Sequence, residues 1–271
     1  MNLELANWHV LITGGSKGIG LACARGFLAE GARVTLVARS IETLLAAQTS
    51  LTAMLTNAGI ADTSLPVNVI AADLRDAADA ERAVEAVERD FGPIDVLVNS
   101  AGAAKRTPAA ELTAASWHDA MQAKFFTYIH VINPLIKKMG ERGRGAVVNV
   151  IGSGGKVAAV THLAGGSANA ALMLASAGFA SAYASKGVRV NAVNPGLTLT
   201  ERLHEGMQAE ARQQGISMEE ALTRAKATRP LGRIAEPSEI ADAVVYLASN
   251  RASYITGAVV AMDGAVTPMV V

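Results

Sequence analysis

The stretch TGGSKGIG (13–20) has the residue types and the spacing to bind a dinucleotide. It follows a short apolar run and opens a helical segment. Glycines at this spacing let the backbone turn tightly and approach a pyrophosphate, which the free N–H groups and the dipole of a helix N-terminus attract. The residues expected to contact the cofactor here are Gly14, Ser16, Lys17, Gly18, Ile19 and Gly20.

The end of the second apolar run decides between the two nicotinamide nucleotides. A carboxylate there would bind the adenosine ribose hydroxyls and repel a 2′-phosphate. This run ends in VARS, so Ala38 stands where the acid would be, and Arg39 and Ser40 follow it. With Lys17 on the same rim, two cations without a carboxylate between them favour NADP(H). Two solvated surface charges are the alternative.

Further motifs complete a pattern over essentially the whole chain: Asp73-Leu74, NSAG (99–102), NPGLTLT (194–200) and PLGRIAEPSEIADAVVYLAS near the C-terminus. In this order they resemble the short-chain dehydrogenase/reductase family. The resemblance implies a dimer or tetramer that binds NAD(P)(H) along the carboxyl ends of its strands. It places Asp73 and Leu74 at the adenine, and Arg39 and Lys17 at a 2′-phosphate. It also implies that Asn99, Ala101 and Gly102 flank the adenosine ribose, and that Pro195, Gly196 and Thr198 hold the nicotinamide.

The catalytic residues of that family do not occur at the corresponding positions. The family uses an asparagine, a serine and a Tyr-x-x-x-Lys motif, in which tyrosine delivers the proton. By spacing, these positions are Lys124, Gly152, Gly165 and Asn169 in this chain. The segment YASK (183–186) is not this motif, because its spacing is Tyr-x-x-Lys and its lysine lies much closer to Pro195 than the family's lysine does. The space of the missing phenol must therefore hold water, substrate or a neighbouring side chain, and Asn169 can still bond the ribose.

Three side chains could carry relocated chemistry. Lys124 could reach the nicotinamide ribose or polarise a carbonyl, or it could extend to solvent beside the cofactor. His162 precedes the empty tyrosine position, and histidine is a common general acid near neutral pH, although lone histidines are more often structural. Ser153 follows the vacant serine position, and a small backbone shift would bring its hydroxyl in.

Hydride transfer needs only a nicotinamide held correctly against its acceptor. We therefore expect an NADP(H)-dependent oxidoreductase that acts on a small carbonyl, imine or activated alkene with a non-standard proton donor. One alternative is a catalytically inactive NADP(H)-binding protein, acting as a sensor or partner subunit. A non-redox enzyme such as a lyase or dehydratase is a further alternative.

The elements that must position these residues alternate between β-branched runs and alanine-rich helical segments. Strands are predicted at 9–13, 33–38, 68–73, 95–100, 146–152, 188–194 and 258–263, and helices near 18–29, 40–57, 76–90, 113–139, 165–184 and 237–248. Because the strands are apolar on both faces, they predict an α/β Rossmann-like doubly wound parallel sheet in three α/β/α layers. We expect a single domain over 1–271 and a helical substrate lid at 200–229.

Composition excludes several classes of protein. The 24 basic and 24 acidic residues give a net charge of zero, which argues against nucleic acid as a partner. No signal peptide or membrane-spanning run is apparent, no histidines have metal-ligand spacing, and the single cysteine, Cys23, suits a reducing compartment. A cytoplasmic enzyme is expected. Small side chains along 168–184 and apolar ones on the helix over 113–139 suit close helix packing, and the resemblance implies that these two helices build a dimer interface. We therefore expect a homotetramer or a homodimer, with packing inside the core as the alternative.

Overall fold

The computed structural model describes residues 2–57, 67–102 and 104–268. Residues 1, 58–66, 103 and 269–271, which include both ends of the predicted domain, lie outside the described residues. Within the described part the strands are β1 (His9–Thr13), β2 (Arg33–Ala38), β3 (Val67–Ala71), β4 (Val96–Asn99), β5 (Gly145–Val150), β6 (Val188–Pro195) and β7 (Val259–Met262). They form one parallel sheet in the order β3-β2-β1-β4-β5-β6-β7.

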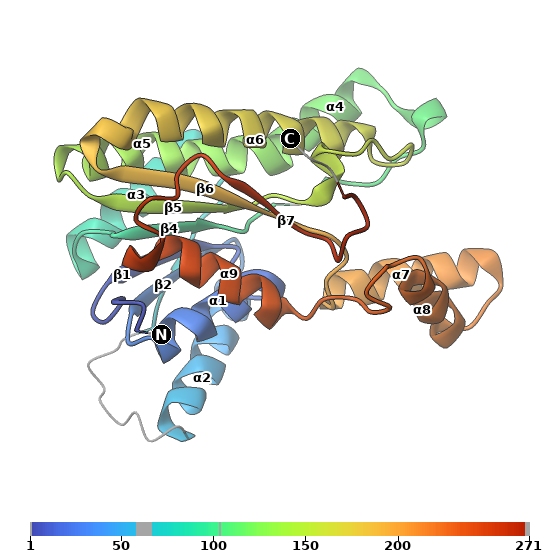
Figure 1. The fold of residues 1–271 in the computed structure, drawn as a ribbon, viewed down its shortest axis with the longest axis horizontal. Helices are drawn as coiled ribbons and strands as arrows, with labels where there is room; N and C mark the ends of the chain where they lie inside the picture. The colour runs from blue at the N-terminus through green and yellow to red at the C-terminus, as the bar shows by residue number, and fades with distance from the viewer. Residues whose placement is uncertain (1, 58–66, 103, 269–271) are drawn as a thin grey trace.

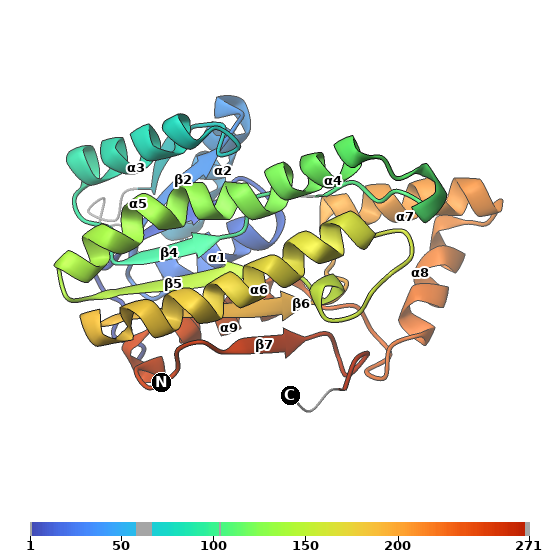
Figure 2. The ribbon, with the colours of Figure 1, turned by 90° about the horizontal axis from the view of Figure 1, so that it is seen from above.

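Helices cover both faces of this sheet (Figures 1 and 2). One layer consists of α1 (Gly18–Ala29), α2 (Ile41–Asn57) and α9 (Pro237–Ala248). The other contains α3 (Ala77–Phe91), α4 (Ala114–Ala120), α5 (Thr127–Glu141) and α6 (Leu163–Tyr183). The predicted doubly wound α/β/α fold is confirmed.

Alternation along a buried strand builds the two layers. In β1, Val10 and Ile12 pack with Phe27 of α1, whereas Leu11 between them packs with Leu135 of α5 on the opposite face. Successive side chains of a strand point to opposite faces, so a strand between two helical layers must be apolar throughout. All five residues of β1 are buried, which explains why its sequence shows no polar alternation.

The helix predicted over 113–139 contains a local change of winding. A π-helical turn, Met121–Phe126, joins α4 to α5. Such turns insert a residue into the helical ladder and often occur at functional sites. Here the turn contains Lys124, one of the residues singled out from the sequence.

The segment before α9 forms the expected pair of helices, α7 (Glu201–Gln214) and α8 (Met218–Ala227), which projects beyond the sheet (Figure 1). Its own small apolar cluster is centred on Met207, Ala211 and Ala221. The two ends of the segment are joined where Thr198 bridges to Ala235 and the Leu199 N–H donates to the Ala235 carbonyl at 2.8 Å. Its action as a lid remains a prediction.

Among the described residues, Leu163–Lys186 is long and apolar enough to cross a membrane by length and composition. Half of that stretch is buried inside the fold, and it packs against β6. Packing against the sheet therefore accounts for its apolar composition.

Candidate active site

The strand order reverses between β1 and β4, and the turns that follow these strands meet there. Ligands of doubly wound sheets bind in such a crevice, outside the carboxyl ends of the strands. Gly14 has a φ of +65°, and a Cβ on it would lie only 2.8 Å from the Cα of Ala101. A glycine is required for this close approach, which brings together two residues that were predicted to contact a cofactor.

The N-terminus of α1 opens into the same crevice. The helix begins at Gly18, and the preceding Lys17 provides no side-chain cap to its free N–H groups. The first turn also lacks an acidic side chain. Uncapped N–H groups at a helix N-terminus need an acceptor and attract anions. The donor set of Gly18, Ile19 and Gly20 therefore fits a pyrophosphate.

The three residues expected near a 2′-phosphate differ in how far their side chains are already engaged in contacts. Arg39 is exposed directly beyond the end of β2. The Ser40 hydroxyl accepts the Thr43 N–H at 3.2 Å, so it caps the start of α2. The Lys17 Nζ lies 2.9 Å from Glu201 Oε2 in α7, and both side chains are exposed. Arg39 is thus the more available of the two predicted cations.

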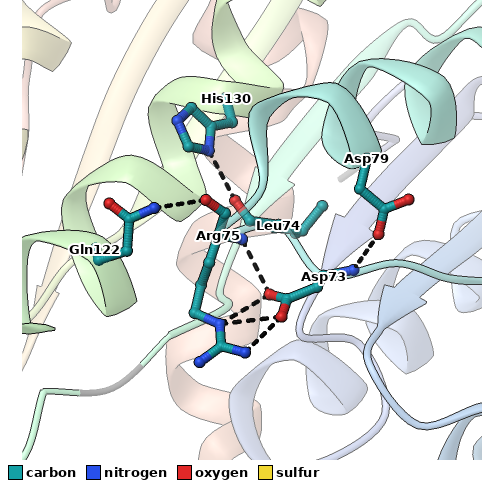
Figure 3. Close-up of polar contacts among 6 residues, drawn as sticks. All are labelled: Asp73, Leu74, Arg75, Asp79, Gln122 and His130. Carbon is teal, nitrogen blue, oxygen red and sulfur yellow. Dashed lines mark hydrogen bonds and ion pairs between the residues drawn. The ribbon is translucent and has the colours of Figure 1, made fainter.

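The turn after β3 is held by an ion pair that sequence reasoning missed (Figure 3). Both Asp73 oxygens accept from the Arg75 guanidinium, at 2.5 to 3.1 Å. These hydrogen bonds lower the pKa of the Asp73 carboxyl to about 2. Asp79 Oδ2 in turn accepts the Asp73 N–H at 2.7 Å. Asp73 therefore stays ionised at the edge where the adenine is expected.

The other side of this turn is anchored to the helix that carries the π turn (Figure 3). Gln122 Nε2 donates to the Arg75 carbonyl at 2.6 Å, and His130 Nδ1 donates to the Leu74 carbonyl at 3.0 Å. Leu74 itself is buried. The adenine side of the crevice and the helix expected to carry catalytic groups are thereby joined into one rigid unit.

Asn99 uses its side chain inside the sheet. Its Oδ1 accepts from the Thr13 hydroxyl at 3.2 Å, and its Nδ2 donates to Asn149 at 3.0 Å. Asn149 donates to the Ser176 hydroxyl of α6 at 2.9 Å. Asn99 is fully buried, so the backbone around it and the exposed Gly102 are what this strand end offers to a cofactor.

Lys124 is directed into the protein. Its Nζ donates to the Tyr128 hydroxyl at 2.8 Å and to the Val150 carbonyl at 3.1 Å, and it lies 4.6 Å from the centre of the Tyr128 ring. Burial, followed by the nearby positive charge of Arg202, lowers the pKa of Lys124 to about 7. The structure thus places this amine at the end of β5 and not in solvent beside the crevice.

The space of the missing side chain at position 165 is filled by His162. A Cβ on Gly165 would overlap Cε1 of the imidazole and would lie 2.7 Å from its Nε2 and from Ala104 Cβ. On another side, the ring Cδ2 is 3.1 Å from where a Gly154 Cβ would be. Of the three alternatives that the sequence left open, a neighbouring side chain occupies the space.

Two features of His162 matter chemically. Its Nδ1 is buried and has no hydrogen-bond partner within the described part of the chain. Burial lowers the pKa of the imidazole below its usual value, and the positive charges of Arg106, Arg202 and Lys124 lower it further. The ring is therefore neutral at pH 7.

The other positions that spacing matches to the family's catalytic residues have local structural reasons for their residues. Gly152 has a φ of +133°, which a serine would adopt only with strain. Asn169 is buried, and its Nδ2 reaches the Gly152 carbonyl at 3.5 Å. Ser153 instead lines a cavity of about 20 Å³ beside Asp263, at the ends of β6 and β7. The structure therefore groups His162 with Asn169 around the glycines and turns Ser153 toward the final strands.

The nicotinamide end of the crevice is predicted at the loop after β6. Pro195 ends that strand, and a Cβ on Gly196 would lie 3.1 Å from Asp263 Cα. Thr198 is buried, and its hydroxyl donates to the Gly196 carbonyl at 3.4 Å. This loop is held by its own contacts and leads directly into α7.

Fold and crevice together define a dinucleotide-binding oxidoreductase fold of the short-chain dehydrogenase/reductase class. The family described as enoyl-(acyl carrier protein) reductase matches residues 14–267. D-threitol dehydrogenase of Mycolicibacterium smegmatis is 34% identical over 259 residues, which cover 95% of this chain and 92% of that protein. The chain belongs to this family of short-chain dehydrogenases/reductases.

Solved structures of reductases and oxidoreductases are also similar to this chain. L-sorbose reductase from Gluconobacter frateurii, complexed with NADPH and L-sorbose, superimposes with a TM-score of 0.91 at 29% identity over the full length of both chains. An NADPH-bound short-chain oxidoreductase from Pseudomonas aeruginosa PAO1, described as containing an atypical catalytic center, has a TM-score of 0.86. It is 30% identical and covers 98% of this chain and 100% of its own.

Proposed function

We propose that this protein is an NADP(H)-dependent oxidoreductase that interconverts a small carbonyl compound and its alcohol, with His162 in the role of the family's tyrosine. The observation that carries the proposal is the position of the imidazole, which fills the volume that a side chain at Gly165 would need. The named relatives are dehydrogenases and reductases, and two structural relatives contain NADPH. The cofactor, when bound, supplies or accepts the hydride.

The chain's own residues would then hold the cofactor and move the proton. Arg39 would bind the 2′-phosphate, the N-terminus of α1 the pyrophosphate, and Asn169 the nicotinamide ribose. Because Nδ1 of His162 is buried and has no hydrogen-bond partner among the described residues, the reacting proton is assigned to Nε2. A neutral imidazole removes the alcohol proton during oxidation, and its protonated form returns a proton to the carbonyl oxygen during reduction. Burial lowers the pKa of the imidazole most, and the charges of Arg106, Arg202 and Lys124 lower it further, Lys124 by the smallest contribution.

The helices at 200–229 are proposed to be a lid over the substrate, within a single domain. Arg202 of α7 donates to the Ala104 carbonyl at 3.3 Å, and Ala104 also touches the Gly165 position, which supports closure over His162. A cytoplasmic homodimer or homotetramer is proposed by likeness to the family.

The cofactor assignment predicts an outcome that binding alone can test. Arg39→Ala is expected to weaken NADPH binding about tenfold or more, because it removes a charge-assisted contact to the 2′-phosphate, and to leave NADH binding unchanged. Fluorescence titration of both nucleotides measures this. Arg89→Ala, at the far end of α3, is the matched control.

Turnover of the wild type tests the reaction itself. NADPH oxidation is followed against ketones, aldehydes, imines and activated alkenes. Tight NADPH binding without turnover of any compound would contradict the proposed reaction and would favour a non-catalytic NADP(H)-binding protein. Tighter binding of NADH than of NADPH would contradict the cofactor assignment.

A further inference from the structure

Two arginines are associated with one loop beside His162, the loop that contains Ala104 and Thr107. Arg202 stands in the first turn of α7 and reaches the Ala104 carbonyl at 3.3 Å. Arg106 lies two residues beyond Ala104, and the neighbouring Thr107 N–H donates to the Thr161 carbonyl at 2.9 Å. One loop thus brings Arg106 next to the segment that carries His162, and the lid brings Arg202 to the same loop.

Neither arginine forms an ion pair with a carboxylate in the part of the chain that the structure describes. By contrast, Arg224 and Arg233 elsewhere on and near the lid bind glutamates at 2.6 Å. Burial lowers the pKa of Arg202, the charge of Arg106 lowers it further, and the charge of Glu205 raises it by the smallest contribution. Two guanidinium groups held this close repel each other unless an anion lies between them.

The His162 segment beside the pair is separated across the sheet from Arg39, the residue proposed to bind the 2′-phosphate. Arg39 follows β2, whereas His162 follows β5, and the sheet order puts β1 and β4 between them. Three strand spacings separate these sites by about 14 Å. The whole chain carries no net charge, so this local excess of positive charge is specific to the loop beside His162.

We propose that the substrate carries an anionic group, such as a carboxylate, that Arg202 and Arg106 bind while its carbonyl carbon faces the nicotinamide. This inference rests on the proposed function and names its substrate class. It also has a consequence for His162, whose pKa is lowered by burial and then further by the charges of both arginines. An anion that neutralises them lets the imidazole take up its proton when the substrate arrives.

The test compares oxo acids with their amides. Pyruvate, acetoacetate and levulinate, each paired with its neutral amide, are assayed for NADPH oxidation with wild type, Arg202→Gln, Arg202→Lys and the control Arg212→Gln, an exposed arginine at the other end of α7. We expect at least one acid to exceed its amide about tenfold or more in kcat/KM. Arg202→Gln should reduce that ratio to near one, whereas Arg202→Lys retains part of it and Arg212→Gln retains all of it.

A binding measurement separates this inference from the proposed reaction. Each acid is titrated calorimetrically into protein saturated with NADPH, whether or not turnover occurs. Binding that weakens about tenfold in Arg202→Gln sustains the anion site, even if no compound is reduced and the redox proposal fails. Equal kcat/KM for acids and amides in the wild type, or no binding of any acid, overturns it. Weaker NADPH binding in Arg202→Gln also overturns it, because the arginine would then serve the cofactor.

Discussion

Replacement of His162 by glutamine is expected to lower kcat for carbonyl reduction by about 10²- to 10⁴-fold, the usual contribution of a positioned general acid. Glutamine keeps the polarity and most of the volume of the ring but cannot carry the proton. The NADPH dissociation constant should stay unchanged. Steady-state kinetics and fluorescence titration measure the two quantities, and His118→Gln, an exposed histidine of α4, is the matched control.

The pH dependence of the same reaction tests the protonation state of His162 in each direction. The pKa of His162 is lowered from 6.5, so the neutral base predominates at pH 7 and the acid form grows as pH falls. Oxidation should therefore rise with pH through the region below 6.5, and reduction should fall. Restoring the family's pair by Gly165→Tyr and Asn169→Lys should recover reduction in a background of His162→Ala and Ala104→Gly, because both groups that a Cβ at position 165 would overlap are then removed. Full activity in His162→Gln would identify solvent as the proton source.

Replacement of Lys124 by methionine is expected to stabilise the fold at neutral pH. The amine is buried between helix and strand and has no carboxylate partner among the described residues. The Tyr128 hydroxyl donates to the Val150 carbonyl at 2.5 Å, a hydrogen bond that does not require the amine. Replacing an unpaired buried charge by an apolar side chain of similar volume removes a desolvation cost. We expect a gain of about 1 kcal/mol or more in the free energy of unfolding at pH 7.

The pH dependence of stability identifies the group responsible. The pKa of Lys124 falls from 10.5 in the unfolded chain to about 7 in the folded protein, so the unfolded chain binds more protons across that window. Stability is therefore gained as pH rises from 7 toward 10.5. Relative to Lys124→Met, the wild type should gain about 3 kcal/mol between pH 7 and 9.5. Chemical denaturation at both values measures it, with exposed Lys137→Met as control. A constant difference between the proteins would contradict the buried amine.

Much of the scaffold follows from local pattern. The strand over 9–13 and the helix over 237–248 have the predicted bounds, because continuous apolar runs and a Glu-Pro start are local signals. The π turn at Met121–Phe126 could not be predicted, since no local pattern indicates it, and neither could the acceptor of Lys124 within it. That acceptor, the Val150 carbonyl, lies on a strand that comes later in the chain. Hydrophobic periodicity indicates which face of a helix is apolar, but it does not indicate how the hydrogen-bonding pattern of one turn changes beside a neighbouring strand.

The candidate site was predictable in its positions and less so in its contacts. Spacing identified Gly165 as the empty position, and its neighbour His162 as a candidate three residues away. The sequence did not show whether water, substrate or a neighbouring side chain lies beside Gly165, because this depends on the backbone conformation at the start of α6. The Lys17–Glu201 pair joins residues far apart in sequence, and no local signal links them. Arg75 is different, because an arginine two residues after Asp73 is a local signal that was overlooked.

The bridge between Thr198 and Ala235 draws together the two ends of the segment that carries α7 and α8, which also contacts the rest of the fold through the Lys17–Glu201 and Arg202–Ala104 pairs. The apolar contacts of these helices close on Met207, Ala211 and Ala221, so little of the sheet's own packing depends on them. Substitutions in α7 and α8 can therefore change which substrate is bound without destabilising the sheet. Arg202 lies in α7, whereas His162 directly precedes α6. Substrate selectivity and proton transfer can therefore evolve independently of each other.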